Sequence, residues 1–315
     1  MIRVCDRTYP LVCDLCHGLD IVYLHQPSQS FIIRTSVFAR KPRMPDQFKN
    51  QLTLTAIAQN AAAGRWRTEA MRSHSSPRLL LIHKGQGRIT VAGLTAGYGP
   101  NNLIFIPAHT MYGFEVGPTV YGLMLAVPAA MAEEWPEDHV HLRLRDVVAQ
   151  KEIASLFDSL EREMGSSKSG HSRAAHYHVG LLSVFFQRQL ETRPADPNEG
   201  RAKTTSARLV AAFTDLVERD FASDKGVADY ARGLGVTPTH LTRCCKQTCG
   251  RSALSLLNDR IIYEARLLLR DTRQPVGSIA KSLGFASAAY FTRSFQARAG
   301  LTPSAFRRKG QHSQL

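Results

Sequence analysis

The feature of this sequence that most restricts its fold is an internal repeat near the C-terminus. Four positions recur after 49 residues: Val227, Ala231, Leu234 and Gly235 correspond to Val276, Ala280, Leu283 and Gly284. Further along, the offset becomes 50: Thr242, Arg243, Lys246 and Gly250 correspond to Thr292, Arg293, Gln296 and Gly300. Such self-similarity indicates two copies of one supersecondary unit.

Each copy has the spacing of a helix-turn-helix. A small alanine stands where two helices must approach closely, and a glycine four residues later allows the sharp turn between them. We therefore expect helix-turn-helix motifs at residues 227–250 and 276–300. Thr237 and Pro238 suit the N-cap and first turn of one second helix, and Ser287 suits the N-cap of the other.

The residues between the two motifs predict a rigid connector. Leu254, Leu257, Ile261, Ala265 and Leu268 follow helical spacing from about Ser252 to Asp271. A helix of this length measures roughly 30 Å, close to the ~34 Å of one DNA turn. One chain is therefore expected to present two helices to successive major grooves.

The charge distribution agrees with a polyanion-binding C-terminal region. Residues 201–315 hold 19 basic and 8 acidic side chains, whereas residues 51–200 hold 14 of each. A cationic module beside a neutral one is typical of a DNA-binding domain joined to a domain with another partner. From charge alone, a solvated basic surface explains the excess equally well.

The N-terminal half predicts a different architecture. Short apolar runs separated by glycine-rich turns from Leu79 to Val127 indicate an antiparallel β-barrel or sandwich. Two amphipathic helices should follow at about residues 150–190 and pair across a homodimer. The predicted class is α+β: an unassigned extension at 1–50, an effector-binding and dimerisation domain at 51–192, a linker at 193–206 and an all-α domain at 207–310.

The C-terminal region resembles the AraC/XylS family of bacterial regulators from about Arg208 to Arg308. The matching positions include Arg260, Ala265, Leu268, Leu269, Ile279, Ala280, Gly284, Phe285, Tyr290, Phe291, Arg293, Phe295, Gly300, Pro303, Phe306 and Arg307. The resemblance implies a DNA reader with two motifs that binds double-stranded promoter DNA. It also implies a gene activator, with RNA polymerase as a further partner.

Residues of the two recognition helices carry over from the family pattern. The first helix would offer Thr239, Thr242, Arg243 and Lys246 to DNA, and the second would offer Ser287, Ala289 and Arg293. Arginine can contact guanine with two hydrogen bonds, and threonine can serve a base or a phosphate. Since alanine offers only a methyl group, the second reading face is the sparser one.

The sequence departs from the family at Cys244 and Cys245, where bulky apolar residues are usual. Cysteine packs as a small hydrophobic residue, so a less tightly filled core is the simpler interpretation. The alternative is a thiol-responsive regulator in which Cys244, Cys245 and Cys249 form a switch. Further upstream, Cys13 to His17 matches a haem attachment motif, which we interpret as chance.

The β-rich segment resembles the cupin-like sensor domain of the same family, chiefly at Lys84 to Arg88 and at Ile106 to Phe114. Metal-binding cupins have a histidine where Tyr112 stands, and their His-x-His pair with a downstream glutamate is missing before Leu79. We therefore expect an organic effector, a small aromatic carboxylate, and neither metal nor cofactor. The candidate ligand-binding residues are Arg65, Trp66, Arg88, Tyr112 and Phe114.

Three other expectations complete the interpretation. Two further His-x-His pairs, at His139 and His141 and at His176 and His178, are expected to be surface histidines. No run of 18 apolar residues occurs, so we expect a cytoplasmic protein without a membrane span. The alternatives to an effector-responsive activator are a cupin metal enzyme with an appended DNA-binding domain and a constitutive regulator with a degenerate barrel.

Overall fold

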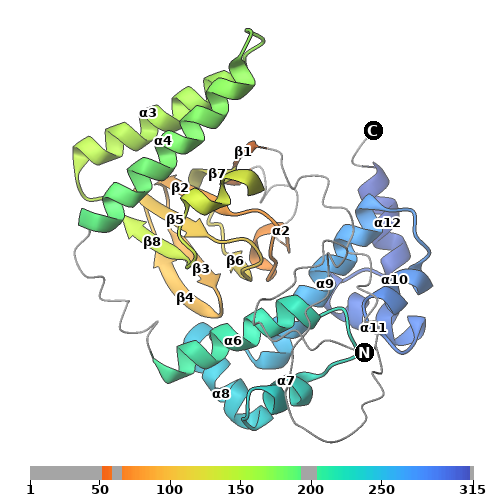
Figure 1. Ribbon diagram of the computed structural model, residues 1–315. Coiled ribbons are helices and arrows are strands. Elements are labelled where there is room, and N and C mark those ends of the chain that lie inside the picture. Colours follow the sequence, from red (N-terminus) through yellow and green to blue (C-terminus); the bar gives the residue numbers. More distant parts are fainter. Residues whose placement is uncertain (1–51, 59–65, 193–203, 313–315) are drawn as a thin grey trace, which may run out of the picture. The chain divides into compact units, whose positions relative to one another are not determined.

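The computed structural model describes residues 52–58, 66–192 and 204–312 (Figure 1). All described residues belong to one compact unit within Asp46–Leu315. The Cys13 to His17 motif that we interpret as chance, the extension at 1–50 and the candidate Arg65 lie outside the described residues, as does most of the predicted linker.

Among the described residues of the N-terminal half, eight strands form two antiparallel sheets. The five-stranded sheet has the order β1-β7-β2-β5-β8 and the three-stranded sheet the order β4-β3-β6. The strands are β1 (Thr53–Ala56), β2 (Arg78–Lys84), β3 (Gly87–Val91), β4 (Leu94–Tyr98), β5 (Asn102–Ile106), β6 (Tyr112–Phe114), β7 (Tyr121–Ala126) and β8 (Val140–Arg143). The predicted antiparallel fold is confirmed, as two sheets that are not closed into one continuous barrel.

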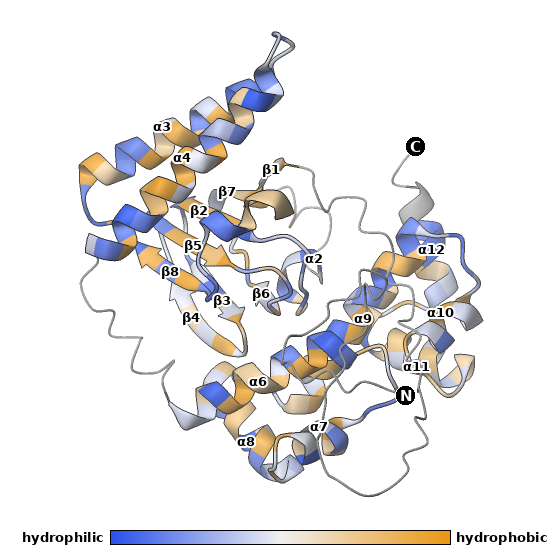
Figure 2. Ribbon diagram, in the orientation of Figure 1, coloured by the Kyte–Doolittle hydropathy of each residue, from blue (hydrophilic) through white to orange (hydrophobic). Residues whose placement is uncertain are grey.

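The central strands of the larger sheet are apolar on both faces because each face packs against a different layer. In β2, Leu79 and Leu81 join the core under the following helices, whereas Leu80 and Ile82 join the core with the smaller sheet. Successive side chains of a strand point to opposite faces, so a continuous apolar run supplies both cores. Figure 2 shows this hydrophobic colour along β2 and β5.

Two long helices cover one face of the five-stranded sheet. Helix α3 (Val147–Met164) begins at Asp146, whose carboxylate accepts hydrogen bonds from the backbone N–H groups of Val148 and Ala149. Helix α4 (His171–Thr192) runs beside α3, and both helices contribute to the core under the sheet. The predicted pair of amphipathic helices is therefore present. A short helix α2 (Trp66–Glu69) and a 3₁₀ helix η1 (Ala129–Glu134) complete this half.

The C-terminal part that the structure describes is helical, as predicted. Its elements are α6 (Thr205–Asp220), α7 (Val227–Gly233), α8 (Pro238–Cys249), α9 (Ala253–Asp271), α10 (Val276–Ser282), α11 (Ala288–Ala299) and α12 (Pro303–His312). One apolar cluster joins α6, α7, α8 and the start of α9, and another joins the end of α9 to α10, α11 and α12. Helix α9 therefore belongs to both cores and connects them rigidly.

The predicted connector is correct in its bounds but not in every residue of its apolar face. The helix begins after Ser252, whose hydroxyl accepts from the Ser255 N–H. Its 19 residues correspond to roughly 28 Å. Leu254 corrects the prediction, because its side chain is 55% exposed. Near its N-terminal end, α9 buries Ala253 and Leu256 together with the predicted Leu257.

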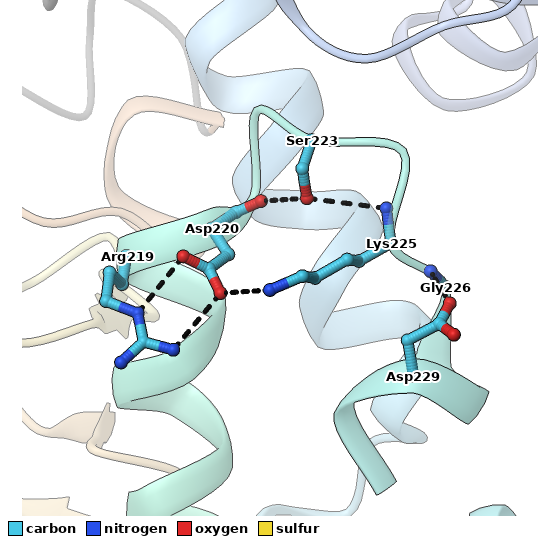
Figure 3. Close-up of polar contacts among 6 residues, drawn as sticks. All are labelled: Arg219, Asp220, Ser223, Lys225, Gly226 and Asp229. Atoms are coloured by element: carbon cyan, nitrogen blue, oxygen red, sulfur yellow. Dashed lines mark hydrogen bonds and ion pairs between the residues drawn. The ribbon is translucent and has the colours of Figure 1, made fainter. Parts of the chain in front are cut away.

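Polar contacts fix the loop between α6 and α7 (Figure 3). The Asp220 carboxylate accepts from the Arg219 guanidinium and from the Lys225 ammonium, and the Arg219 hydrogen bond lowers the pKa of Asp220. The Ser223 hydroxyl donates to the Asp220 carbonyl and accepts from the Lys225 N–H. At the start of α7, the Asp229 carboxylate accepts from the Gly226 N–H. The loop is thus held at both ends.

This loop packs against the turn of the second motif. Gly284 has φ +82°, and a Cβ added to it would lie 2.0 Å from the Ser223 carbonyl oxygen. The equivalent Gly235 has φ +68°, but a Cβ there would meet nothing within 4 Å. Both glycines allow the same turn. Only Gly284 also lets the second motif pack closely against the α6–α7 loop, which precedes the first motif.

We expect Gly284→Ala to destabilise the protein more than Gly235→Ala. Each substitution incurs the cost of a left-handed backbone, about 1 kcal/mol, and only Gly284→Ala adds a clash with backbone that cannot rotate away. The expected losses of unfolding free energy are about 2 kcal/mol or more and about 1 kcal/mol. Urea denaturation of both variants measures the difference, and equal losses would contradict the packing described for Gly284.

Candidate functional site

Helices α8 and α11 are built alike at both ends. Thr237 caps α8 by accepting from the His240 N–H, and Ser287 caps α11 by accepting from the Tyr290 N–H. Each helix ends at a glycine with φ 70°, Gly250 or Gly300. The predicted caps are confirmed, and the turn glycines have the left-handed conformation that the sequence required. The two halves of the repeat are therefore two helix-turn-helix motifs.

One face of each helix is buried and the other is free to meet a ligand. Leu241, Cys244 and Cys245 of α8 are buried, as are Phe291 and Phe295 of α11. The sequence-predicted DNA-binding residues lie on the remaining surface: Thr239, Arg243, Lys246, Ser287, Ala289 and Arg293 are exposed, and Thr242 is half-buried. The structure thus divides these residues into two groups, one on each helix.

A buried ion-pair network joins α9 to α6. The Arg260 guanidinium donates to Glu218 of α6 at 2.6 and 3.3 Å and to Glu264 at 2.9 Å, and it lies 3.8 Å from the centre of the Phe221 ring. Although burial alone would lower the pKa of Arg260, the two carboxylates outweigh it and raise that pKa. The network fixes the connector to the helix that supports the first motif.

Cys244 and Cys245 of α8 are buried in its core, and Cys249 is half-buried beside them. Burial raises the pKa of the Cys245 thiol to about 12 and also raises the pKa of Cys249. The sulfur of Cys249 donates to the Cys245 carbonyl. Because the thiolate is the reactive form, this environment favours the packing interpretation over the thiol-responsive alternative.

We therefore expect oxidants to leave DNA binding unchanged. In a protein with Cys5, Cys13 and Cys16 replaced by serine, the diamide-treated and reduced forms should bind the same duplex within about twofold. Cys244 and Cys245 are buried, and the raised pKa of the Cys245 and Cys249 thiols slows their reaction. Electrophoretic mobility shift measures the affinity, and mass spectrometry after iodoacetamide treatment at pH 8 measures the modification. A tenfold difference in affinity between the two forms would restore the thiol-responsive alternative.

The predicted ligand-binding residues are distributed over three places. Trp66 packs against Tyr263 of α9 and Phe306 of α12, with ring centres 5.7 and 6.0 Å apart. Tyr112 and Phe114 are buried and stacked, with their centres separated by 6.4 Å. Arg88 is exposed and forms a two-pronged ion pair with Glu115. The structure therefore brings Tyr112 and Phe114 together, whereas Trp66 makes its ring contacts with the C-terminal helices.

Sequence reasoning missed the cation nearest to the stacked rings. The Arg72 guanidinium lies 4.4 Å from the centre of the Tyr112 ring and 5.1 Å from that of Phe114, and it donates to the Thr68 carbonyl at 2.7 Å. Arg72 is buried. Its position seven residues before the apolar run that begins at Leu79 carried no local signal, because an isolated bridge to Tyr112 places it there.

A cavity of about 450 Å³ lies between the three-stranded sheet and the turn after α8. Arg88 and Phe114, two of the predicted ligand-binding residues, line it. Its other lining residues are Glu69, Met71, Thr90, Thr95, Gly113, Glu115, Cys249, Gly250 and Arg251. Arg251 is also paired with Asp259 at 2.9 Å. The cavity combines charged groups and hydroxyls with one aromatic wall.

His141 and His176, one from each His-x-His pair, form hydrogen bonds with different partners. His141 shares a 2.6 Å hydrogen bond with Asn102, and His176 contacts the Ser172 carbonyl one helical turn earlier. Within the described residues, His, Cys, Asp and Glu nowhere gather in a group of three or more that could hold a metal ion. In that same part of the chain, every helix is too short or too polar to cross a membrane.

Comparisons with known proteins match both halves of the chain. The family model of the AraC-like ligand binding domain matches residues 57–180, and that of a helix-turn-helix domain matches residues 230–309. The arabinose operon regulatory protein of Escherichia coli K12 is 35% identical over 129 residues, which cover 41% of this chain and 43% of that protein. Its Salmonella typhimurium LT2 counterpart is 29% identical over 151 residues, or 48% and 53%. The chain thus spans about half the length of the curated relatives it matches.

Solved structures also align with this chain. The C-terminal domain of AraT from Geobacillus stearothermophilus is 28% identical and covers 34% of this chain and 88% of that chain, with a TM-score of 0.32. ToxT from Vibrio cholerae O395 is 14% identical and covers 82% of this chain and 96% of that one, with a TM-score of 0.39. The two matched domains, in this order along one chain, show that the protein belongs to the AraC/XylS family.

Proposed function

We propose that the protein is a sequence-specific DNA-binding transcription regulator that reads two half-sites and responds to a small-molecule effector. The observation that carries this proposal is the pair of equally capped helices with exposed arginines at matching places, Arg243 and Arg293. An arginine on a recognition helix can contact guanine in the major groove through two hydrogen bonds. The arabinose operon regulators among its relatives are consistent with this function.

The effector in this proposal is a small organic acid with an aromatic ring, bound in the cavity next to the turn after α8. Arg88 of β3 and Arg251 of the turn after α8 supply positive charge to that cavity, and Phe114 supplies an apolar wall. Glu115 and Asp259 already pair with the two arginines, so a bound carboxylate would exchange one ion pair for another. Such an exchange changes the contacts of the turn directly.

The position of the cavity gives the effector a route to the first motif. At the β3–β4 turn, a Cβ on Gly93 would lie 2.2 Å from Cγ1 of Val210 in α6. Met71 and Met111 share an apolar cluster with α6 and α8. An effector can shift the population of DNA-competent molecules only if it binds one arrangement of these contacts better than another.

A thermal-shift screen of aromatic and aliphatic carboxylic acids tests the effector proposal. A bound acid at one hundred times its dissociation constant stabilises the folded protein by about 2.7 kcal/mol, and Arg88→Ala and Arg251→Ala should each reduce the shift. The control is Arg143→Ala, an exposed strand residue outside this cavity. A shift that survives both arginine substitutions would place the effector elsewhere, and no shift across the screen would support a constitutive regulator.

We also propose that the protein is a cytoplasmic homodimer that activates transcription together with RNA polymerase. Tyr177, Leu181 and Val184 of α4 are exposed and lie three or four residues apart, so they form one apolar stripe. A second copy of this chain would cover the stripe. Light scattering should show a dimer for the protein and a monomer for Leu181→Asp, and a dimer in both would contradict this interface.

A further inference from the structure

Three side chains on α8 are connected in a row from its core to its exposed face. Nη2 of Arg243 lies 2.9 Å from Nδ1 of His240, and Nε2 of the same imidazole lies 3.6 Å from Sγ of Cys244. Cys244 is buried, His240 is half-buried and Arg243 is exposed. His240 lies one helical turn before both Arg243 and Cys244, so the arrangement is built within this one helix.

The chemistry of arginine fixes the protons of this row. Because a guanidinium has only donors, Nδ1 of His240 must accept from it. The remaining ring proton is then on Nε2, which donates to the sulfur of Cys244. The usual apolar residue at position 244 could not accept this hydrogen bond, so the cysteine that departs from the family pattern has a specific partner.

We propose that His240 is a positioning residue that presents Arg243 to the first DNA half-site, with Cys244 holding the imidazole in the required tautomer. This inference rests on the proposed DNA-reading role of α8. Arg243 has five N–H donors and uses one on His240, so the others stay available for guanine. Holding the long side chain in one orientation before DNA binds reduces the entropy that binding would otherwise cost.

The second motif has no such arrangement at the corresponding positions. Tyr290 stands where His240 does in the first motif, and its ring packs against Phe285 with centres 5.7 Å apart. Ser294 stands in the place of Cys244. Within the part of the chain that the structure describes, the Arg293 side chain makes no hydrogen bond or ion pair. Base discrimination should therefore be sharper at the half-site that Arg243 reads.

A double-mutant cycle on selected DNA tests this role. The probe is the set of duplexes that the wild-type protein enriches from a random-sequence pool, with each base pair of both half-sites then varied singly. Arg243→Ala should reduce discrimination at one base pair about tenfold or more, and His240→Ala should reduce it there about threefold to tenfold. In the Arg243→Ala background, His240→Ala should add nothing, because its effect passes through the arginine.

The conservative variant separates positioning from general support of the helix. In His240→Asn, the amide oxygen takes the place of Nδ1 as acceptor, so discrimination should return to within about twofold of wild type. Equal effects of His240→Ala with and without Arg243 would overturn the proposal, since His240 would then contact DNA independently. If the wild-type protein enriches no sequence at all, the proposed function itself fails.

Alanine substitutions of Cys244 and Cys245 form a matched pair that tests the buried end of the row. Both are buried in α8, and alanine at either position leaves a cavity of similar size, but only Cys244 contacts His240. Cys244→Ala should lower discrimination at the Arg243 base pair about twofold or more, whereas Cys245→Ala should leave it unchanged. Equal effects of the two variants would remove Cys244 from the arrangement.

Discussion

Replacing Glu218 with alanine is expected to lower the free energy of unfolding by about 3 to 5 kcal/mol. Glu218 and Arg260 are both buried, and their side chains are only 6% exposed. Removing the carboxylate leaves a guanidinium in the core that cannot lose its proton to escape the cost of burial. Urea denaturation followed by circular dichroism measures the loss.

Glu264→Ala is the matched control, because it removes the other carboxylate that contacts the same guanidinium. Its side chain is 23% exposed, so water can replace part of the lost interaction and the expected loss is about 1 kcal/mol. Glu218→Ala should also weaken the apparent DNA binding at 37 °C, because a larger fraction of the protein is then unfolded. Similar losses for the two variants would contradict the assignment of Glu218 as the dominant partner of Arg260.

The affinity for DNA is expected to fall about a thousandfold to ten-thousandfold between 50 and 200 mM salt. If six to eight basic residues of the two motifs contact phosphates, the log–log slope of affinity against salt is about −5 to −7. The charge distribution supports this number, because residues 201–315 hold 19 basic and 8 acidic side chains. Fluorescence anisotropy with a labelled duplex at several salt concentrations gives the slope directly.

Two exposed lysines give this prediction its internal controls. Lys246 lies on α8, whereas Lys168 lies between α3 and α4, away from both motifs. Lys246→Ala should make the slope less steep by about 0.9, and Lys168→Ala should leave it unchanged. A slope near zero for the wild-type protein would count against DNA as the partner of the basic region.

The sequence predicted the C-terminal half in detail because its signals are local. Thr237 and Ser287 cap helices through N–H groups three residues away, and Gly235 and Gly284 take turns that require a positive φ. Such features depend on a few neighbouring residues, and each copy of the repeat contains them. His240 also had a local signal, since Arg243 and Cys244 follow it by three and four residues. The sequence spacing alone does not show that both side chains turn toward the imidazole.

The features that the sequence did not predict depend on contacts between distant residues. The Glu218–Arg260 pair spans 42 positions, and neither residue alone reveals a buried partner. Trp66, predicted to bind a ligand, makes ring contacts with α9 and α12. Leu254 fits the apolar spacing of α9 but points away from the core. Periodicity identifies the face of a helix, whereas tertiary packing decides which part of that face is covered.

Hydroxyl-radical footprinting on a selected duplex tests most directly whether one chain reads two half-sites. The wild-type protein should protect two segments on one face of the DNA, about 10 base pairs apart from centre to centre. Arg243→Ala should weaken protection of one segment, and Arg293→Ala should weaken protection of the other. A single protected segment, or the loss of the same segment in both variants, would contradict the account.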